Sequence, residues 1–202
     1  MANKYEKITV RPVTYVLIGA VLVAVLLIIL LLSGTFRSSK DKIYYAYKNN
    51  TTQAESTLSR DHAYKKISLA KAEELIDSGE NILLFIGTPQ CIHCVNHIGT
   101  FNEYFNEAVV EGETATASSF FKGTIYYVEL KVIGEAFSLP NLGDFLLKYK
   151  VEQTEEQTTH RLLAFSEGKL IEEYKNSQTT PASIRNNTQY FYRQVITQLK
   201  AN

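Results

Sequence analysis

The chain has 202 residues, of which 45% are hydrophobic and 21% charged, and its 21 basic side chains balance its 21 acidic ones. This length suits one domain plus an additional segment, and the low glycine and proline content excludes collagen-like and proline-rich disordered proteins. Because the net charge is zero and no basic patch stands out, the sequence does not predict nucleic-acid binding. Two cysteines are too few for the disulfide framework of a small secreted protein.

A charge-free apolar segment lies near the N-terminus, after a tail of residues 1–12. It covers residues 13–32, and a helix of about 20 residues spans about 30 Å of hydrocarbon. We expect a single-pass membrane anchor; the alternative is a cleaved signal peptide, whose apolar core is normally shorter. Basic residues on both sides do not decide the orientation. The short tail and the large body nevertheless favour a cell-membrane protein with an extracellular body.

The next segment, residues 33–60, is polar and has no sustained apolar period. We therefore expect it to be a linker that spaces the body from the bilayer. Within it, the sequence IYYAY at residues 43–47 predicts an aromatic patch at the membrane interface. The globular domain is then expected to cover residues 61–202.

The first part of this domain alternates between strands and helices. Residues 65–68 predict a short edge strand, and Ser68 is a suitable N-cap for the helix that follows. The run ILLFI at residues 82–86 is wholly apolar, which predicts a central strand covered on both faces. After a turn at residues 87–90, apolar residues spaced by three and four predict a helix with Cys91 at its N-terminus.

The second part contains a further strand, a helix, a hairpin and a closing helix. Residues 124–130 predict the strand, and Asn141 is expected to cap the helix. Residues 160–165 and 170–175 predict two antiparallel strands across a tight turn. Thr180 is expected to cap the closing helix and Pro181 to be its first residue. The whole order predicts an α/β fold with a mixed central sheet flanked by helices.

The residues suited to chemistry converge on Cys91-Ile92-His93-Cys94, a C-x-x-C motif between the central strand and a helix. The N–H groups and partial positive charge of a helix N-terminus stabilise a thiolate, which is the attacking species in disulfide exchange. We predict that Cys91 is the nucleophile and that Cys94, one turn further and less exposed, resolves the mixed disulfide. A protonated His93 would favour the Cys91 thiolate; the alternative is a solvated loop histidine.

The segment ILLFIGTPQCIHC, the later strand YYVEL, the hairpin LLAFSEGKL and the closing helix together resemble thioredoxin-like thiol-disulfide oxidoreductases. The resemblance covers residues 64–200. It is strongest to membrane-anchored Gram-positive members such as the bacteriocin transport accessory proteins. It implies a thioredoxin-like fold behind the single N-terminal transmembrane helix, two catalytic cysteines and no cofactor.

Three positions depart from the family pattern. Gln90 replaces the aromatic residue that usually precedes the first cysteine, and Phe85 stands where thioredoxin has a buried acid. Without that acid, the resolving step depends on solvent or another base. His160 aligns with the cis-proline of the family, and because a non-proline cis bond costs about 2.5–4 kcal/mol, we expect a trans peptide between Thr159 and His160.

Three functions remain open at this point. The first is a membrane-tethered oxidoreductase that exchanges disulfides with exported or cell-surface client proteins and is reset by a redox partner, in a direction that the sequence does not fix. The second is a Cys/His metal site that uses Cys91, Cys94 and His160, with His97 as a further candidate. Apart from that site, His97 and His62 are expected to be solvated. The third is a non-enzymatic adaptor in an export or surface assembly.

Overall fold

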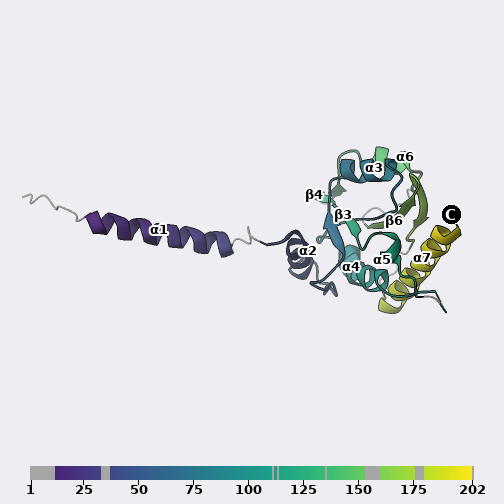
Figure 1. Ribbon diagram of the computed structural model, residues 1–202, viewed down its shortest axis with the longest axis horizontal. Helices are drawn as coiled ribbons and strands as arrows, with labels where there is room; N and C mark the ends of the chain where they lie inside the picture. The colour runs from purple at the N-terminus through teal and green to yellow at the C-terminus, as the bar shows by residue number, and fades with distance from the viewer. Residues whose placement is uncertain are drawn as a thin grey trace, which may run out of the picture. The chain divides into compact units, whose positions relative to one another are not determined.

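The chain divides into two compact units, residues 1–38 and residues 39–202, each considered by itself (Figure 1). The first contains helix α1 (Pro12–Leu32), and the second contains the remaining described helices and strands. The computed structural model describes residues 12–32, 37–110, 112, 114–134, 136–152, 160–175 and 180–201.

Helix α1 covers the segment that the sequence predicts as an anchor. Residues 12–30 are long and apolar enough to cross a membrane, and none of that stretch is buried within the protein. A helix that is apolar on every side is suited to lipid, but a signal sequence near the N-terminus passes the same test of length and composition. The apolar helix is confirmed, and its role as an anchor stays a prediction.

A five-stranded sheet in the order β1-β3-β2-β6-β7 forms the centre of the second unit. Strand β2 (Ile82–Gly87) lies in the middle, parallel to β3 (Ile125–Glu129) and antiparallel to β6 (Arg161–Ser166). The two outer strands are β1 (Tyr64–Lys66), parallel to β3, and β7 (Lys169–Glu173), antiparallel to β6. All residues of β2 are buried, which confirms the predicted central strand.

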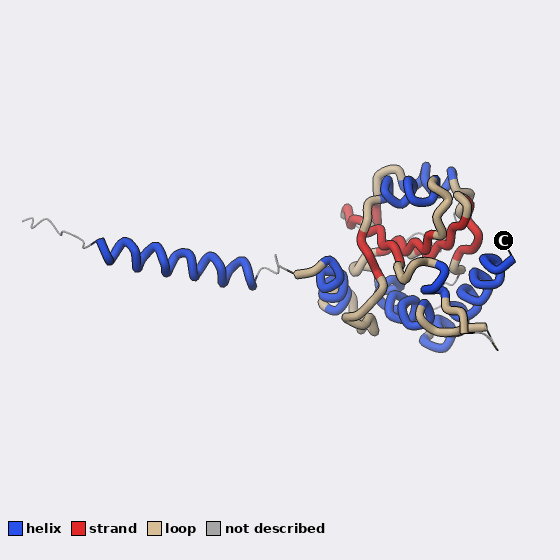
Figure 2. The backbone as a smooth tube through the Cα atoms, viewed as in Figure 1, coloured by secondary structure: helices blue, strands red, loops and turns tan. Residues whose placement is uncertain are grey.

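Helices cover both faces of this sheet (Figures 1 and 2). Helices α3 (Leu69–Asp77) and α6 (Leu142–Lys148) lie on one face, whereas α4 (Ile92–Phe105), α7 (Pro181–Ala201) and the short α5 (Ala117–Phe120) lie on the other. This mixed sheet between two helical layers is the thioredoxin-like α/β fold that the sequence predicts.

The core has two parts, one on each side of the sheet. Because successive side chains of a strand point to opposite faces, β2 contributes to both parts. Leu83 and Phe85 pack in the cluster beneath α4 and α7, whereas Leu84 and Ile86 pack in the cluster beneath α3 and α6. The two clusters hold β2, and therefore the turn that follows it, in a fixed position.

The helix starts follow the predicted capping residues in two cases out of three. The hydroxyl of Ser68 accepts a hydrogen bond from the Lys71 N–H at 3.2 Å, and the Thr180 hydroxyl accepts one from the Ser183 N–H at 3.3 Å. Asn141 precedes α6 but has a left-handed backbone (φ 64°) and makes no side-chain capping bond. The expected cap at Asn141 is therefore wrong in mechanism, although the helix begins where predicted.

A small hairpin after β3 was not predicted. Strands β4 (Lys131–Ile133) and β5 (Ala136–Ser138) pair antiparallel as a separate two-stranded sheet. Each strand has three residues, and those of β4 are exposed. A strand of three residues is too short to show an apolar period, so no pattern in the sequence predicts it.

The predicted linker at residues 33–60 is wrong from Ser39 onward. Helix α2 (Ser39–Lys48) belongs to the compact unit, and its Ile43 and Tyr47 side chains are only 3% and 0% exposed. Both lie in the same core cluster as Phe85 and the cysteines. The domain therefore begins at Ser39 rather than at residue 61, and Ile43 and Tyr47 of the IYYAY segment are core residues.

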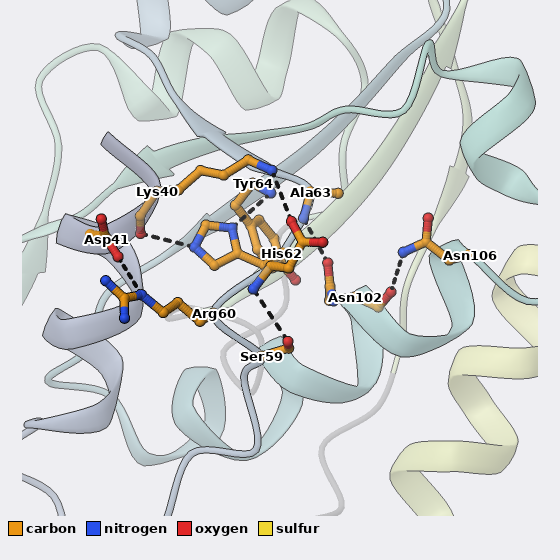
Figure 3. A network of polar contacts seen from close by, with 10 residues as sticks. Lys40, Asp41, Ser59, Arg60, His62, Ala63, Tyr64, Asn102 and Asn106 are labelled. Carbon is orange, nitrogen blue, oxygen red and sulfur yellow. Dashed lines mark hydrogen bonds and ion pairs between the residues drawn. The ribbon is translucent and has the colours of Figure 1, made fainter. Parts of the chain in front are cut away.

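Residues 39–63, called here the N-terminal segment, are held by polar contacts around His62 (Figure 3). The His62 Nε2–H donates to the Lys40 carbonyl oxygen at 3.0 Å, and its Nδ1 accepts from the Tyr64 N–H at 3.1 Å. The Ala63 N–H donates to Asn102 Oδ1 on α4 at 2.8 Å. His62 is 1% exposed, so the expected solvated histidine is wrong, and burial lowers its pKa.

Candidate functional site

The site begins where β2 ends and the chain turns into α4. Thr88 and Pro89 are buried and Gln90 is exposed, so the turn is fixed against the core with one side chain in solvent. Cys91 is the N-cap of α4 in an extended conformation, as predicted. Its Sγ accepts a hydrogen bond from the Cys94 N–H at 3.4 Å. The first sulfur therefore lies at the helix N-terminus, where backbone N–H groups stabilise negative charge.

The two cysteines differ in burial in the predicted order, although both are buried. Cys91 is 4% exposed and Cys94 is 0% exposed, and both are in the thiol form. The exposed fraction of Cys91 is nevertheless small for an attacking thiol. Burial, followed by the hydrogen bond with Cys91, raises the pKa of the Cys94 thiol well above its ordinary value. Cys94 therefore carries its proton at neutral pH.

The floor of the site is apolar. Phe85 is fully buried and stacks on Tyr127 with ring centroids 5.7 Å apart, and it meets the edge of Phe101 at 5.8 Å. A Cβ atom on Gly87 would lie 3.0 Å from Cys94 Sγ, so a glycine at this position lets the resolving sulfur approach the backbone closely. Position 85, where the resemblance to thioredoxin implies a buried acid, is thus filled by a packed aromatic ring.

Three histidine rings come together around the first turns of α4. The rings of His93 and His160 are nearly parallel, with centroids 5.6 Å apart, and the His97 ring lies 4.6 Å from that of His160. His97 is 0% exposed, so its expected solvation is wrong. Burial lowers the pKa of His97 to about 4. The four-residue spacing of His93 and His97 places them on one helix face, a signal in the sequence that we did not use.

The hydrogen bonds of His97 define its tautomer. Its Nδ1 lies 2.7 Å from the His93 carbonyl oxygen, which can only accept, so Nδ1 carries the hydrogen. The other nitrogen, Nε2, is then an unprotonated acceptor. Among the described residues, His97 Nε2 and His93 Nδ1 are buried nitrogens without a hydrogen-bond partner. Such atoms are uncommon in folded proteins because the lost bond is costly.

His160 enters the site from the strand beside β2. Arg161 pairs with Ile86 across β6 and β2, so the residue before it lies next to the end of β2. His160 is 5% exposed, and the predicted trans peptide between residues 159 and 160 lies outside the described residues. Arg161 is anchored by a buried ion pair with Glu173 at 2.7 Å, which fixes the start of β6.

The metal hypothesis gains no geometric support. In the part of the chain that the structure describes, no group of three or more His, Cys, Asp or Glu side chains is arranged to hold a metal ion. The rings of His93 and His160 stack face to face instead of directing their nitrogens at one point. The site is therefore a pair of thiols beside a stack of histidines.

Comparisons with known proteins add little to this geometry. No family model matches the chain, and no curated protein matches it. A solved structure described as "A putative oxidoreductase with a thioredoxin fold" matches with 13% identity and a TM-score of 0.38, covering 62% of this chain and 93% of that chain. A likeness this distant carries no information on the reaction. The fold is described by its strand order and by the helices on both faces of the sheet.

Proposed function

We propose that this protein is a membrane-tethered thiol-disulfide oxidoreductase in which Cys91 is the nucleophile and Cys94 resolves the mixed disulfide. The observation that supports it most is the position of Cys91. Its Sγ lies at the N-cap of α4, 3.4 Å from the Cys94 N–H, and the second thiol follows one turn later. This arrangement stabilises a thiolate at the first position and leaves a second thiol within reach of the product.

The proposed reaction has two exchange steps. The Cys91 thiolate attacks a client disulfide and forms a mixed disulfide, releasing one client sulfur as a thiolate. Cys94 then attacks Cys91 Sγ, closes the Cys91–Cys94 disulfide and releases the second client sulfur, so the client gains two electrons. The reverse sequence oxidises a client. Because only 4% of Cys91 is exposed, we expect clients whose disulfide lies in an accessible chain segment.

The clients are proposed to be exported or cell-surface proteins. The support is helix α1, which is long and apolar enough to hold the chain in a membrane. Three basic residues before α1 and several after it leave the orientation to experiment. Protease treatment of intact cells tests this: degradation of the body supports an extracellular domain, and protection until the cells are lysed contradicts it.

Trapping tests the reaction itself. Cys94→Ser in the full-length protein should accumulate mixed disulfides through Cys91, because the resolving thiol is gone. These complexes should migrate as dithiothreitol-sensitive bands in membranes quenched with N-ethylmaleimide. Cys91→Ser is the matched control and should trap nothing. An absence of complexes in Cys94→Ser, or full exchange activity in the double variant, would contradict the proposal.

The reduction potential separates this proposal from the adaptor hypothesis. A working pair should equilibrate within the range of known catalysts, roughly −270 to −120 mV, whereas a static structural bridge lies below about −300 mV. Equilibration of the full-length protein in glutathione or dithiothreitol buffers, followed by alkylation and mass measurement, gives the value. A potential below about −300 mV would favour the adaptor.

A further inference from the structure

We propose that Nε2 of His97 accepts the proton that Cys94 loses when the pair releases its client. This inference rests on the proposed function and names the base that the resolving step requires. That step needs one, because Cys94 is fully buried and must become a thiolate before it can attack. The position occupied by an acid in thioredoxin is Phe85 here, which offers no acceptor.

Helix geometry brings the His97 ring toward Cys94. The two residues are three apart on α4, a spacing that places Cβ atoms about 5–6 Å apart on adjacent turns. Helical side chains also lean toward the N-terminus, which directs the His97 ring back toward the preceding turn, where His93 and Cys94 lie in sequence. The 2.7 Å bond from its Nδ1 to the His93 carbonyl oxygen agrees with that direction.

The same bond leaves the second nitrogen ready to accept a proton. With Nδ1 donating to a carbonyl, Nε2 carries the lone pair, and it is buried without a partner among the described residues. A buried acceptor without a bond costs about 1–3 kcal/mol. A hydrogen bond from the Cys94 thiol, formed as the proton moves, would remove that cost.

The surroundings of His97 keep it neutral until the reaction begins. The titratable groups shown around it are His93 on α4, His160 before β6 and Tyr174 after β7, whose ring lies 5.7 Å away, and Cys94 precedes it by three residues on α4. Burial lowers the pKa of His97 to about 4, so the ring is unprotonated at neutral pH. Because its pKa is so low, His97 holds the proton only briefly and then gives it to the thiolate of the departing client.

The step balances as follows. The Cys94 S–H bond breaks, and its proton goes to His97 Nε2. The Cys94 sulfur attacks Cys91 Sγ, the Cys91–Cys94 bond forms, and the bond from Cys91 to the client breaks. The electron pair leaves with the client sulfur as a thiolate, which takes up the proton from the His97 imidazolium. The cysteine pair is oxidised by two electrons and the client is reduced by two.

A pH profile distinguishes this route from deprotonation by solvent. If His97 accepts the proton, the reactive state contains a Cys94 thiol and a neutral imidazole. That state predominates between a pH of about 4 and the raised pKa of Cys94, so the rate is constant in between. If solvent removes the proton, the rate rises about tenfold per pH unit because it follows the thiolate fraction.

The two sulfur steps can be observed separately with 5,5′-dithiobis(2-nitrobenzoate). The reduced full-length protein in detergent should release one thionitrobenzoate as Cys91 reacts and a second as Cys94 resolves. The second phase should be independent of pH from about 5 to 8 in the wild type. His97→Gln should slow it by about 100-fold at neutral pH and make it rise about tenfold per pH unit. A second phase in the wild type that already rises tenfold per pH unit would overturn the proposal.

His93→Gln is the matched control. The bond to His97 uses the backbone oxygen of residue 93, so this substitution leaves the His97 tautomer unchanged. We expect it to alter the first phase, because it changes the motif itself, and to keep the plateau of the second. If His93→Gln rather than His97→Gln abolishes the plateau, His93 is the acceptor and the proposal is wrong.

Failure of the proposed function gives a different result. Cys94→Ser should release only the first thionitrobenzoate; if Cys91 does not react at all, the exchange function fails before His97 is tested. Far-UV circular dichroism and the Cys91 alkylation rate report whether His97→Gln keeps its fold. His97→Asn provides a second neutral replacement with the same expected loss of the plateau.

Discussion

Two buried histidines show how differently the N-terminal segment and the cysteine site are built. His62 and His97 are 1% and 0% exposed, and burial lowers the pKa of both. His62 uses both ring nitrogens, donating to Lys40 and accepting from Tyr64. His97 uses one nitrogen and leaves the other without a bond among the described residues. Burial alone therefore does not separate a structural histidine from a reactive one, whereas the bonding does.

The ion pairs of the two regions differ in the same way. In the N-terminal segment, Lys40 and Asp61 pair at 3.6 Å with side chains that are 54% and 99% exposed. Beside the cysteine site, Arg161 and Glu173 pair at 2.7 Å with side chains that are 7% and 4% exposed. Exposed pairs add little to stability, whereas a buried charge is costly without its partner. The strand beside the cysteine site is thus held by a buried ion pair, and removing one partner would leave the other charge buried and unpaired.

The largest effect should come from separating the buried pair. Glu173→Leu leaves the Arg161 guanidinium buried, and arginine cannot neutralise itself by losing a proton. We expect the free energy of unfolding to fall by about 3–5 kcal/mol. Urea unfolding of the full-length protein in detergent, followed by tyrosine fluorescence, measures it.

Two controls sharpen this result. The double variant Arg161→Met/Glu173→Leu removes both charges and should recover most of the lost stability. Asp61→Asn breaks the exposed pair and should leave the unfolding midpoint unchanged. An equal loss in Asp61→Asn and Glu173→Leu would remove the distinction between the two regions.

The next effect is a loss of stability in acid. The folded pKa of His97, about 4, lies below the ordinary 6.5, so the folded state favours the neutral ring. The stabilisation is complete above pH 6.5 and is lost as the pH falls toward 4; the pKa difference corresponds to about 3 kcal/mol. His62 adds to the loss in the same direction, since its pKa is also lowered. Urea unfolding at a series of pH values measures the slope.

Replacing each histidine separates the two contributions. His97→Gln should flatten the acid slope at little cost at pH 7.5, because the ring makes one hydrogen bond there. His62→Gln should flatten it less and cost about 1–2 kcal/mol at pH 7.5, because two buried backbone groups lose a partner. Equal costs at pH 7.5 would contradict the difference in bonding between the two rings.

The smallest effect concerns the contact between the N-terminal segment and α4. A Cβ atom on Gly99 would lie 2.7 Å from the Thr57 carbonyl carbon and 2.9 Å from the Leu58 nitrogen. Gly99→Ala should therefore displace this segment and cost about 1–3 kcal/mol. Gly143→Ala on α6 is the matched control, because nothing lies within 4 Å of its added Cβ. Thermal unfolding should leave the Gly143 variant unchanged or slightly more stable, and an equal loss in both variants would exclude a close approach at Gly99.

Most elements of the fold could be predicted because their signals are local. The apolar run of β2, the caps of α3 and α7 and the hairpin of β6 and β7 each follow from residues close together in the chain. Helix α2 could not be predicted, because only Ile43 and Tyr47 among its ten residues are buried, which is too few for a sustained apolar period. The strands β4 and β5 were too short to leave a pattern.

Part of the candidate site could be predicted from local sequence signals, and part could not. Cys91 and Cys94 were found from the motif, because a C-x-x-C between a strand and a helix is contiguous in sequence. The burial of Cys91 and the approach of His160 to His97 involve segments far apart in the chain. The spacing of residues in the sequence does not predict how close such distant segments come in the folded protein.

By itself, the sequence determined that this protein has an apolar N-terminal helix, a mixed α/β body and two cysteines at a helix start. Apolar periodicity and capping act over a few residues, and these features depend on nothing else. Only the tertiary structure decided that the chain from Ser39 joins the core. It also decided that both ring nitrogens of His62 are bonded, whereas Nε2 of His97 has no partner among the residues that the structure describes. The physical reason is that burial and hydrogen bonding depend on which distant segments of the chain pack together. The hydrogen bonds of a buried imidazole, in turn, decide whether it only stabilises the fold or can also take part in a reaction.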